Sequence, residues 1–183
     1  NDAGIVFLTA AGYRDGSGVW NVGDLGFYWS STADDERNAY NVFFNMPMHM
    51  PMPDVNPGEH GCRAYGYSVR LITDASVTPA PTPTTTGTAK RTGDIDVNWV
   101  QLWTGGPKFA EYNVGASNVT ETGTTMTFTE ATKAGAEYVW GANWCTPSKE
   151  DMEHLMTAAK GVTDEKVNCE IVRDVNIIGF KFT

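Results

Sequence analysis

The residues with the clearest potential for chemistry lie in the segment Met46-Pro-Met-His-Met-Pro-Met52, which combines thioether and imidazole side chains. Methionine sulfur and histidine nitrogen are the soft ligands that Cu(I) prefers. The prolines, however, stiffen the segment into a rod, and a rod need not bring its sulfur atoms to one point. The alternative is a loop whose methionines cover an apolar surface or contact a partner, because methionine adapts to irregular contacts. We favour this alternative and expect no metal ion and no cofactor.

A second set of candidates consists of side chains that could act as ligands, or as a nucleophile with its base. His49, His60 and Cys62 lie close in the sequence, but no neighbouring residue supplies an orienting group or an oxyanion-binding pattern. Glu150 and His154 are spaced as i and i+4, which is also the spacing of an ordinary surface pair on a helix. We therefore expect a protein that is not an enzyme and has no catalytic residues.

The three cysteines do not define a site. Cys62, Cys145 and Cys169 leave at least one thiol unpaired, and their spacing matches no zinc-binding pattern. Their pairing stays open, so cysteine use does not decide the redox compartment.

The composition limits the partners and the location. The 183 residues carry 13 basic and 22 acidic side chains, a formal net charge of −9. Such a surface repels phosphate groups, so we expect neither nucleic acid nor anionic lipid as a partner. No apolar run approaches the ~20 residues needed to span a bilayer, and nothing resembles a signal peptide, so we expect a mature or excised segment without membrane insertion. The low charged fraction and a Pro/Thr-rich stretch favour an extracellular or cell-surface location.

Residues 75–93 divide the elements that must position these side chains into two groups. This stretch is rich in Thr and Pro, which bring little apolar area, so it is expected to be an extended linker outside the core. Before it, Asp34-Asp-Glu36 is expected in a solvated loop, and the Pro and Gly breaks of residues 46–62 predict a long irregular excursion. Strand-forming residues on this side of the linker occur in 5–11, 27–32, 39–44 and 63–72.

The part after the linker supplies both predicted helices. The first is expected to begin at Thr127, with Glu130 completing a capping box, and to run through Tyr138. The second is expected to begin at Ser148 and to bury residues at helical spacing before it ends at Gly161, namely Met152, Leu155, Met156 and Ala159. Strands are expected at 96–103, 108–114, 170–173 and 177–182. Large aromatic side chains contribute heavily to small cores, which predicts buried tryptophans at positions 99, 103, 140 and 144.

Neither part can build a complete core by itself. The part before the linker has strands and no helix to cover them, and the part after it has two helices and few strands. A bare sheet face costs roughly 25 cal/mol per Å² of apolar area. The two parts are therefore expected to join, within one molecule or between molecules.

Short motifs on both sides of the linker show a family resemblance. Those before it are Phe7-Leu-Thr-Ala-Ala-Gly-Tyr-Arg14, Val22-Gly23, Tyr28-Trp-Ser-Ser-Thr32, Ala39-Tyr40 and Tyr65-Gly-Tyr-Ser-Val-Arg70. Those after it are Asn113-Val-Gly-Ala116, Trp140-Gly-Ala-Asn-Trp-Cys-Thr-Pro-Ser-Lys-Glu150 and Gly179-Phe-Lys-Phe-Thr183. Together they resemble the Fibrobacter succinogenes major paralogous domain family, which is abundant in surface proteins of Bacteroidetes and belongs to the C-type-lectin-like fold. In that family the second set of motifs comes first.

The resemblance implies an α+β fold that is C-type-lectin-like, with twisted antiparallel sheets, two helices and a long irregular loop region. Residues 1–74 would be its C-terminal half, 75–93 the linker and 94–183 its N-terminal half. Three alternatives explain the rotated order: circular permutation, a segment spanning two successive tandem domains, or halves exchanged between molecules. Cys145 stands where the family usually has a basic residue. The motifs of calcium-dependent lectins are absent, so the resemblance does not imply calcium-mediated sugar binding.

The same resemblance places the ligand-facing surface in residues 33–63, a long excursion supported by a rigid sheet. We expect a non-catalytic ligand-recognition module of a secreted or cell-surface, adhesin-like bacterial protein, with a protein or glycan as ligand. The alternative is a structural repeat of an extracellular fibre or stalk, assembled by exchange of half-domains between neighbours. The residues expected to contact the ligand are Arg37, Asn41, His49, Asp54, Asn56, Glu59, His60 and Arg63.

Overall fold

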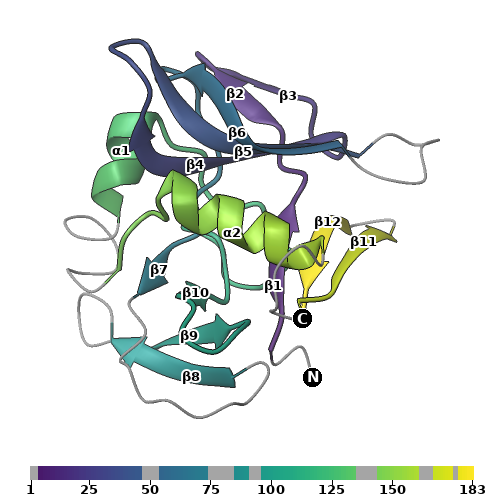
Figure 1. Ribbon diagram of the computed structural model, residues 1–183. Coiled ribbons are helices and arrows are strands. Elements are labelled where there is room, and N and C mark those ends of the chain that lie inside the picture. The colour runs from purple at the N-terminus through teal and green to yellow at the C-terminus, as the bar shows by residue number, and fades with distance from the viewer. Residues whose placement is uncertain are drawn as a thin grey trace.

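Antiparallel sheets and two short helices make up the described part of the protein (Figure 1). A computed structural model describes residues 4–46, 54–73, 85–90, 96–134, 144–160, 167–174 and 177–183. Within these ranges the helices are α1 (Phe128–Lys133) and α2 (Lys149–Ala159). Two sheets have three strands each. One has the order β1 (Val6–Thr9), β12 (Ile177–Phe182), β11 (Cys169–Asp174). The other has the order β4 (Leu25–Ala33), β5 (Asn38–Asn45), β6 (Asp54–Cys62). A third sheet has four strands, in the order β7 (Ile72–Thr73), β10 (Lys108–Ala110), β9 (Asp96–Gln101), β8 (Thr85–Lys90). The fourth is a hairpin of β2 (Tyr13–Asp15) and β3 (Gly18–Trp20). The predicted α+β class, with antiparallel sheets and two helices, is therefore confirmed.

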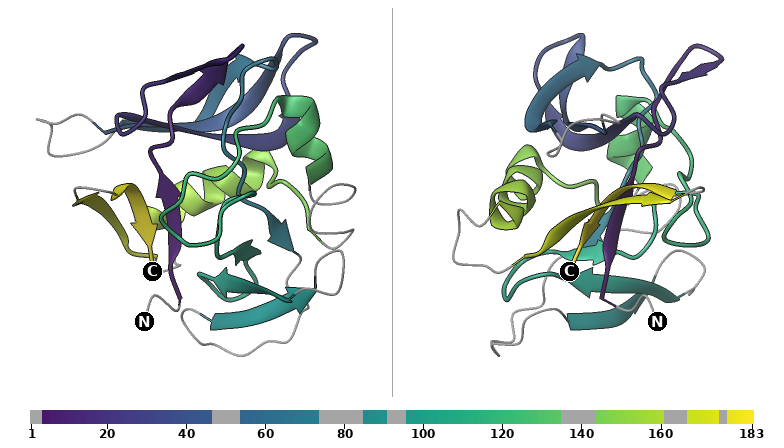
Figure 2. Two further views of the ribbon diagram at one scale, coloured as in Figure 1. Left: turned by 180° about the vertical axis from the view of Figure 1, so that it is seen from behind. Right: turned by 90° about the vertical axis from the view of Figure 1, so that its right-hand side faces the viewer.

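Strands that lie far apart in the sequence share sheets. β1 pairs with β12, so that Val6 faces Phe182 and Leu8 faces Phe180. β7, from before the linker, pairs in the same antiparallel way with β10 from after it. Figures 1 and 2 show the purple β1 beside the yellow β12. The two parts of the chain are thus joined by backbone hydrogen bonds within one molecule.

Two clusters of buried side chains lie on either side of the β4–β5–β6 sheet. The cluster on the α2 side takes residues from both parts of the chain, including Tyr28, Phe44, Leu155 and Phe180. So does the cluster on the α1 side, which includes Trp29, Leu71, Ala131 and Trp144. The adjacent β4 residues Tyr28 and Trp29 enter different clusters, because successive side chains of a strand point to opposite faces. Figure 1 shows α2 on one side of this sheet and the β2–β3 hairpin on the other.

Both helices begin at the residues that the capping pattern predicts. The Thr127 side chain accepts a hydrogen bond from the backbone N–H of Glu130, and the Glu130 carboxylate accepts one from Thr127 N at 2.8 Å. Ser148 and Asp151 make the same reciprocal pair, with Ser148 N donating to Asp151 Oδ2 at 2.8 Å. α2 then buries its apolar side as expected, with Met152, Leu155 and Met156 in the core.

The prediction that α1 runs through Tyr138 is tested only as far as Ala134. α1 spans Phe128–Lys133, and the N–H of its C-cap residue Ala134 donates to the carbonyl of Ala131, an i→i+3 bond. Residues 135–143 and Gly161, where the two predicted helix ends fall, lie outside the described residues. Neither described helix has the length and apolarity needed to cross a membrane.

Residues 54–62 form a strand, which corrects the prediction of an irregular excursion over 46–62. β6 pairs with β5 along its whole length, with one shift of register opposite the middle of β5. Pro57 falls at this shift, and β6 is an outer strand of its sheet. Proline is tolerated at a bulge of an edge strand because its missing N–H costs no ladder bond there. The methionine- and histidine-rich residues 47–53 lie outside the described residues.

Residues 63–72 do not form the half-buried alternating strand that their sequence predicts. The whole stretch 66–72 is buried, and only isolated bridges and the two-residue β7 give it sheet character. The reason is its position between the two clusters, with Val69 and Leu71 in one and Ile72 in the other. Residues 85–90 of the predicted linker also differ from expectation, because they pair with β9 as β8. This piece contains no proline and three threonines, so it keeps every N–H that a strand needs.

The tryptophan predictions hold in part. Trp103 and Trp144 are buried as expected. Trp99 is only half-buried, and the Lys108 ammonium lies over its ring at 4.5 Å from the centroid. Trp140 lies outside the described residues.

The interior also holds polar side chains that tie distant segments together. Arg70 is 1% exposed, and its guanidinium donates to the backbone carbonyls of Phe7, Ala110 and Glu111. Burial lowers the pKa of Arg70 to about 10, so it stays charged at neutral pH. The resulting bonds hold β1 and β10 on the two sides of residues 66–72.

Candidate functional site

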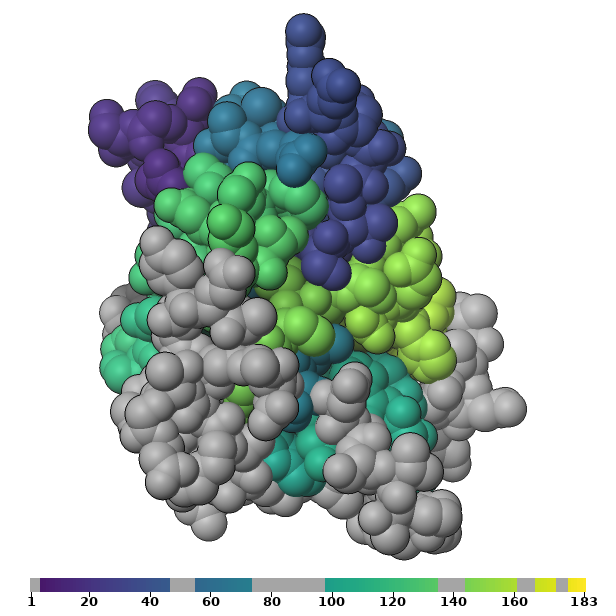
Figure 3. Space-filling model, turned by 90° about the vertical axis from the view of Figure 1, so that its left-hand side faces the viewer, coloured from purple at the N-terminus to yellow at the C-terminus, as the bar shows by residue number. Residues whose placement is uncertain are grey.

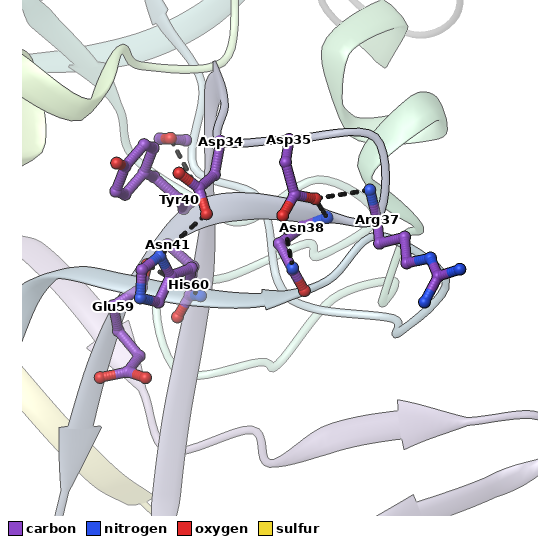
Figure 4. A network of polar contacts seen from close by, with 9 residues as sticks. Asp34, Asp35, Arg37, Asn38, Tyr40, Asn41, Glu59 and His60 are labelled. Atoms are coloured by element: carbon purple, nitrogen blue, oxygen red, sulfur yellow. Dashed lines mark hydrogen bonds and ion pairs between the residues drawn. The ribbon is translucent and has the colours of Figure 1, made fainter.

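The turn between β4 and β5 is organised by one carboxylate. Asp35 accepts hydrogen bonds from the backbone N–H of Arg37 at 2.6 Å, from that of Asn38 at 2.7 Å and from the Asn38 side chain at 3.0 Å (Figure 4). The Asn38 side chain, followed by these two backbone groups, holds the pKa of Asp35 below its ordinary value. Figure 4 shows the Arg37 guanidinium pointing away from this turn. The turn therefore presents the Arg37 cation on an ordered backbone.

A column of four side chains runs along the edge of the same hairpin. His60 Nδ1 lies 3.1 Å from Asp34 Oδ2, and its ring stacks on Tyr40 with centroids 5.6 Å apart and planes inclined at 26°. Tyr40 and His60 are paired across β5 and β6, which places them side by side. The Lys149 ammonium lies 4.3 Å from the centroid of the Tyr40 ring, a cation–π contact. The His60 side chain is 56% exposed, so solvent and ligands reach the column.

The first turn of α2 is fixed to β4, and this brings Lys149 to the column. The Lys149 N–H donates to Thr32 Oγ1 at 3.0 Å, and the Ser31 N–H donates to the carbonyl of Pro147 at 2.7 Å. Lys149 Nζ also lies 3.5 Å from Glu153 Oε1, one turn further along α2. The lysine is thus held from two sides.

Two further predicted contacts lie beside this column. Arg63 donates from Nη1 to the carbonyl of Asp35 at 3.2 Å, and its guanidinium lies 4.6 Å from the centroid of the Phe128 ring. At the bulge, Asn56 Nδ2 donates to Glu59 Oε2 at 2.8 Å. We use the name hairpin end for the surface made by Asp34, Arg37, Tyr40, His60, Arg63 and Lys149. Figure 3 shows the β4–β5 turn projecting from the molecule at this place.

The predicted contact residues have different outcomes. Arg37, His60 and Arg63 all lie at the hairpin end, with the Arg37 guanidinium pointing away from the turn, whereas Asn56 and Glu59 pair at the bulge further along β6. Asn41 was a wrong prediction, because it is 1% exposed and its Nδ2 donates to the carbonyl of Glu59 at 3.3 Å inside the sheet. Its position in β5 points it into the interior. His49 lies outside the described residues, and Asp54 is described only by its backbone in β6.

Sequence reasoning missed three members of the hairpin end. The sequence places Asp34 in a solvated loop and indicates no ligand contact for Tyr40 or Lys149. Tyr40 meets His60 only because β5 and β6 pair, and that pairing was hidden by the Pro and Gly content of β6. Lys149 directly follows the predicted cap residue Ser148, so its place at the start of α2 could be predicted from the sequence. Its contact with Tyr40 of β5 could not.

The side chains of this surface differ in the kinds of contact that they can make. Among the described residues no group of three His, Cys, Asp or Glu side chains could hold a metal ion. The Asp34–His60 pair could orient an imidazole, but within the described ranges no serine, threonine or cysteine side chain is hydrogen-bonded to His60. Cys62, Cys145 and Cys169 form no disulfide bonds with one another. A cation, an aromatic ring, an imidazole and a carboxylate in a row offer several kinds of non-covalent contact instead.

Comparison with known proteins adds no relative to this description. No protein-family model, no curated protein and no solved structure matches the chain.

Proposed function

We propose that this chain is a non-catalytic ligand-recognition module of a secreted or cell-surface protein, and that the hairpin end binds its protein or glycan ligand. The observation that carries the proposal is the column Lys149–Tyr40–His60–Asp34, in which each side chain is held by the next at the exposed edge of a sheet. Side chains ordered before binding lose less conformational freedom when the ligand arrives. The column therefore has the pre-organisation that a recognition surface needs.

The strand pairing supports the lectin-like part of the proposal. In a rotated C-type-lectin-like domain, the last strand of the chain would lie beside the first, and β12 does pair with β1. The β4–β5–β6 sheet, packed on both faces, would then be the rigid support for the ligand-facing surface. An adhesin-like role in a bacterial surface protein follows from this interpretation of the fold.

The experiment is a binding screen with matched variants. The wild-type chain is applied to arrays of immobilised glycans and extracellular proteins, together with His60→Ala, Tyr40→Ala and the control Glu150→Gln. Glu150 is exposed and follows Lys149 directly, but it is not part of the column. We expect at least one ligand whose signal falls tenfold or more in both alanine variants and is unchanged in the control. His60→Ala removes an exposed side chain, so its unfolding midpoint should match that of the wild type. If every ligand binds all four proteins equally well, the proposal that the hairpin end is the binding site is wrong.

A second candidate function has its own observation. The β1–β12 and β7–β10 pairs join segments from the two sides of residues 75–93, so the same pairs could form between two molecules. Such an exchange would build a dimer or an extracellular fibre. The tether raises the effective concentration of the partner segment in the same molecule, so we expect a monomer at nanomolar protein. Light scattering over a dilution series tests this, and oligomers that persist at nanomolar concentration would favour the fibre.

A further inference from the structure

β11 lies at the edge of its sheet and has a strand partner on one side. The sheet order is β1, β12, β11, and in the part of the chain that the structure describes β11 pairs with β12 alone. Figures 1 and 2 show β12 between β1 and β11, with β11 outermost. An edge strand presents a row of backbone N–H and C=O groups to which another strand can pair.

The hydrogen bonds to β12 show which backbone groups of β11 point outwards. Asn168, just before β11, exchanges both backbone bonds with Thr183, at 2.9 and 3.0 Å. In an antiparallel ladder such hydrogen-bonded pairs alternate with pairs that make no mutual bonds. Cys169 and Ile171 lie one and three residues beyond Asn168, so their N–H and C=O groups point away from β12.

The other side of β12 confirms this alternation. The Ile178 carbonyl accepts the N–H of Ala10, which follows β1, at 2.7 Å. Ile178 thus directs its backbone groups to the β1 side, and by the same alternation so does Phe180, the ladder partner of Ile171. The outer edge of β11 is therefore defined by the pairing on both sides of β12.

The two faces of β11 carry different side chains. Ile171 is half-buried and packs against the core cluster on the α2 side. Glu170 points to the opposite face, where it is 61% exposed and lies 2.6 Å from Lys181 Nζ. Val172 shares this face with Glu170 and is half-buried. A strand added at this edge would extend both faces.

We infer that the outer edge of β11 pairs antiparallel with β11 of a second copy of this chain, about a two-fold axis at Ile171. A two-fold axis makes the same strand meet itself, so the strand has to complement its own sequence. The outward-pointing groups must also face one another across the new ladder. Among the registers with long overlap, this leaves two-fold axes at residues 170, 171 and 172.

Charge selects one of these three registers. An axis at residue 170 would place two Glu170 carboxylates directly opposite each other, and an axis at residue 172 would place Glu170 opposite Asp174. Like charges directly opposite one another in a ladder are destabilising. An axis at Ile171 instead places Glu170 opposite Val172 and the Asn168 amide opposite the Asp174 carboxylate. It also brings the two Ile171 side chains together beside the core.

This dimer is distinct from the functions proposed above. It keeps the β1–β12 and β7–β10 pairs within each molecule, so it requires no exchange of halves. It uses no residue of the hairpin end, and it does not rest on what that surface binds. One short strand from each copy gives a small interface, and small interfaces are weak. We therefore expect dimers at micromolar protein and monomers at nanomolar protein.

Sedimentation equilibrium of the whole chain, from about 1 μM to about 500 μM, measures the dimer constant. Val172→Lys should tighten the dimer about fivefold, because each new lysine faces Glu170 of the second copy. Val172→Glu should weaken it by at least as much. Thr129→Lys and Thr129→Glu make the same changes of net charge at an exposed position of α1. Both of these controls should leave the dimer constant within twofold.

Crosslinking tests the register directly. In a Cys145→Ser, Cys169→Ser background, Ile171→Cys places two thiols in a hydrogen-bonded pair, with Cα atoms about 5.5 Å apart, which suits a disulfide. Val172→Cys places them on a diagonal, about 7–8 Å apart, which does not. Mild oxidation should therefore link the first variant much faster than the second, and the parent background should stay unlinked.

Several results would overturn the inference. These are a wild-type chain that stays monomeric at the highest concentration, Val172→Lys and Val172→Glu with equal dimer constants, or Val172→Cys linking faster than Ile171→Cys. A dimer that is indifferent to both charges at position 172 and persists at nanomolar protein would point to exchanged halves. A different protein that pairs with β11 while the chain alone stays monomeric would replace the second copy as the partner.

Discussion

The interior and the β4–β5 turn both hold networks of polar side chains, and the two networks differ in burial and in the distance along the chain that their bonds span. In the interior, Asn113 Nδ2 lies within hydrogen-bond distance of Tyr28 Oη, at 3.0 Å, and of Thr9 Oγ1, at 3.2 Å, so three distant segments meet. Arg70 likewise bonds carbonyls 40 or more residues away. At the β4–β5 turn, Asp35 bonds residues two and three positions further on.

This difference separates polar groups that hold the fold from polar groups that are available to a ligand. A buried side chain that bonds distant backbone groups cannot be removed without leaving those groups unsatisfied. An exposed side chain that bonds only its own turn can be removed with small effect on the rest of the protein. Substitutions in the interior should therefore change stability, and substitutions at the hairpin end should change binding.

The largest expected effect is that of Arg70→Met. The substitution keeps an unbranched apolar stem but removes the donors to Phe7, Ala110 and Glu111, and unsatisfied buried carbonyls cost roughly 1–3 kcal/mol each. We expect a loss of about 3 kcal/mol in the free energy of unfolding, measured by urea denaturation. Arg37→Met at the hairpin end is the matched control and should change stability by less than about 0.5 kcal/mol. Equal losses in the two variants would contradict the comparison.

Asn113→Ala should have the next largest effect. Asn113 is 1% exposed, and its amide also bonds the carbonyl of Thr122 at 3.1 Å. Leaving this set of buried groups unpaired should cost about 2 kcal/mol in the free energy of unfolding. Asn118→Ala, in the exposed turn that follows, is the control and should cost less than about 1 kcal/mol. If Asn118→Ala lowers the free energy of unfolding more than Asn113→Ala does, burial is not what determines the size of the loss.

The sequence predicted the features that depend on local physics. The capping boxes at Thr127 and Ser148 are local, since each needs only two residues three positions apart, and both were located correctly. The buried strand β1 and the closing pair β11–β12 follow from apolar runs and were also located. The overall class could be predicted for the same reason.

The features that depend on pairing could not be predicted. Pro57 lies at a bulge, and only the neighbouring strand β5 shows that β6 continues on both sides of it. Asn41 is as polar as Asn56, but its place in the register of β5 buries it. The same holds for Arg70. The alternating pattern around it predicts a half-buried strand, but its position between the two buried clusters buries it completely. Arg37, His60 and Arg63 could thus be placed near the turn from the sequence, but their neighbours Tyr40 of β5 and Lys149 of α2 could not, because those contacts depend on strand pairing and helix packing.

Ser148→Ala should give a smaller change than the interior substitutions. The Ser148 hydroxyl accepts the N–H of Asp151 at 3.1 Å, and loss of such a cap costs about 1 kcal/mol. Ser148→Asp keeps an acceptor at the same place and should recover most of that stability in the same urea titration. Because α2 carries Lys149 to the column, Ser148→Ala should also weaken any ligand of the hairpin end, whereas Ser148→Asp should not. A destabilised variant with unchanged binding would show that the column forms without the cap.

The smallest expected effect is on the pH dependence contributed by Asp35. Hydrogen bonds from Asn38 and from the backbone lower the pKa of this carboxyl below its ordinary value of 3.8 in the folded protein. The ionised form is thus favoured by folding, so its contribution is complete above about pH 4 and is lost as the pH falls through the lowered pKa. Asp35→Asn removes the charge and should make the protein slightly less stable than the wild type at pH 7, with the difference vanishing near pH 2. Unfolding midpoints at the two pH values measure this. If the difference persists at low pH, the turn is held by the geometry of residue 35 and not by its charge, and the hairpin end would then stay ordered in acid.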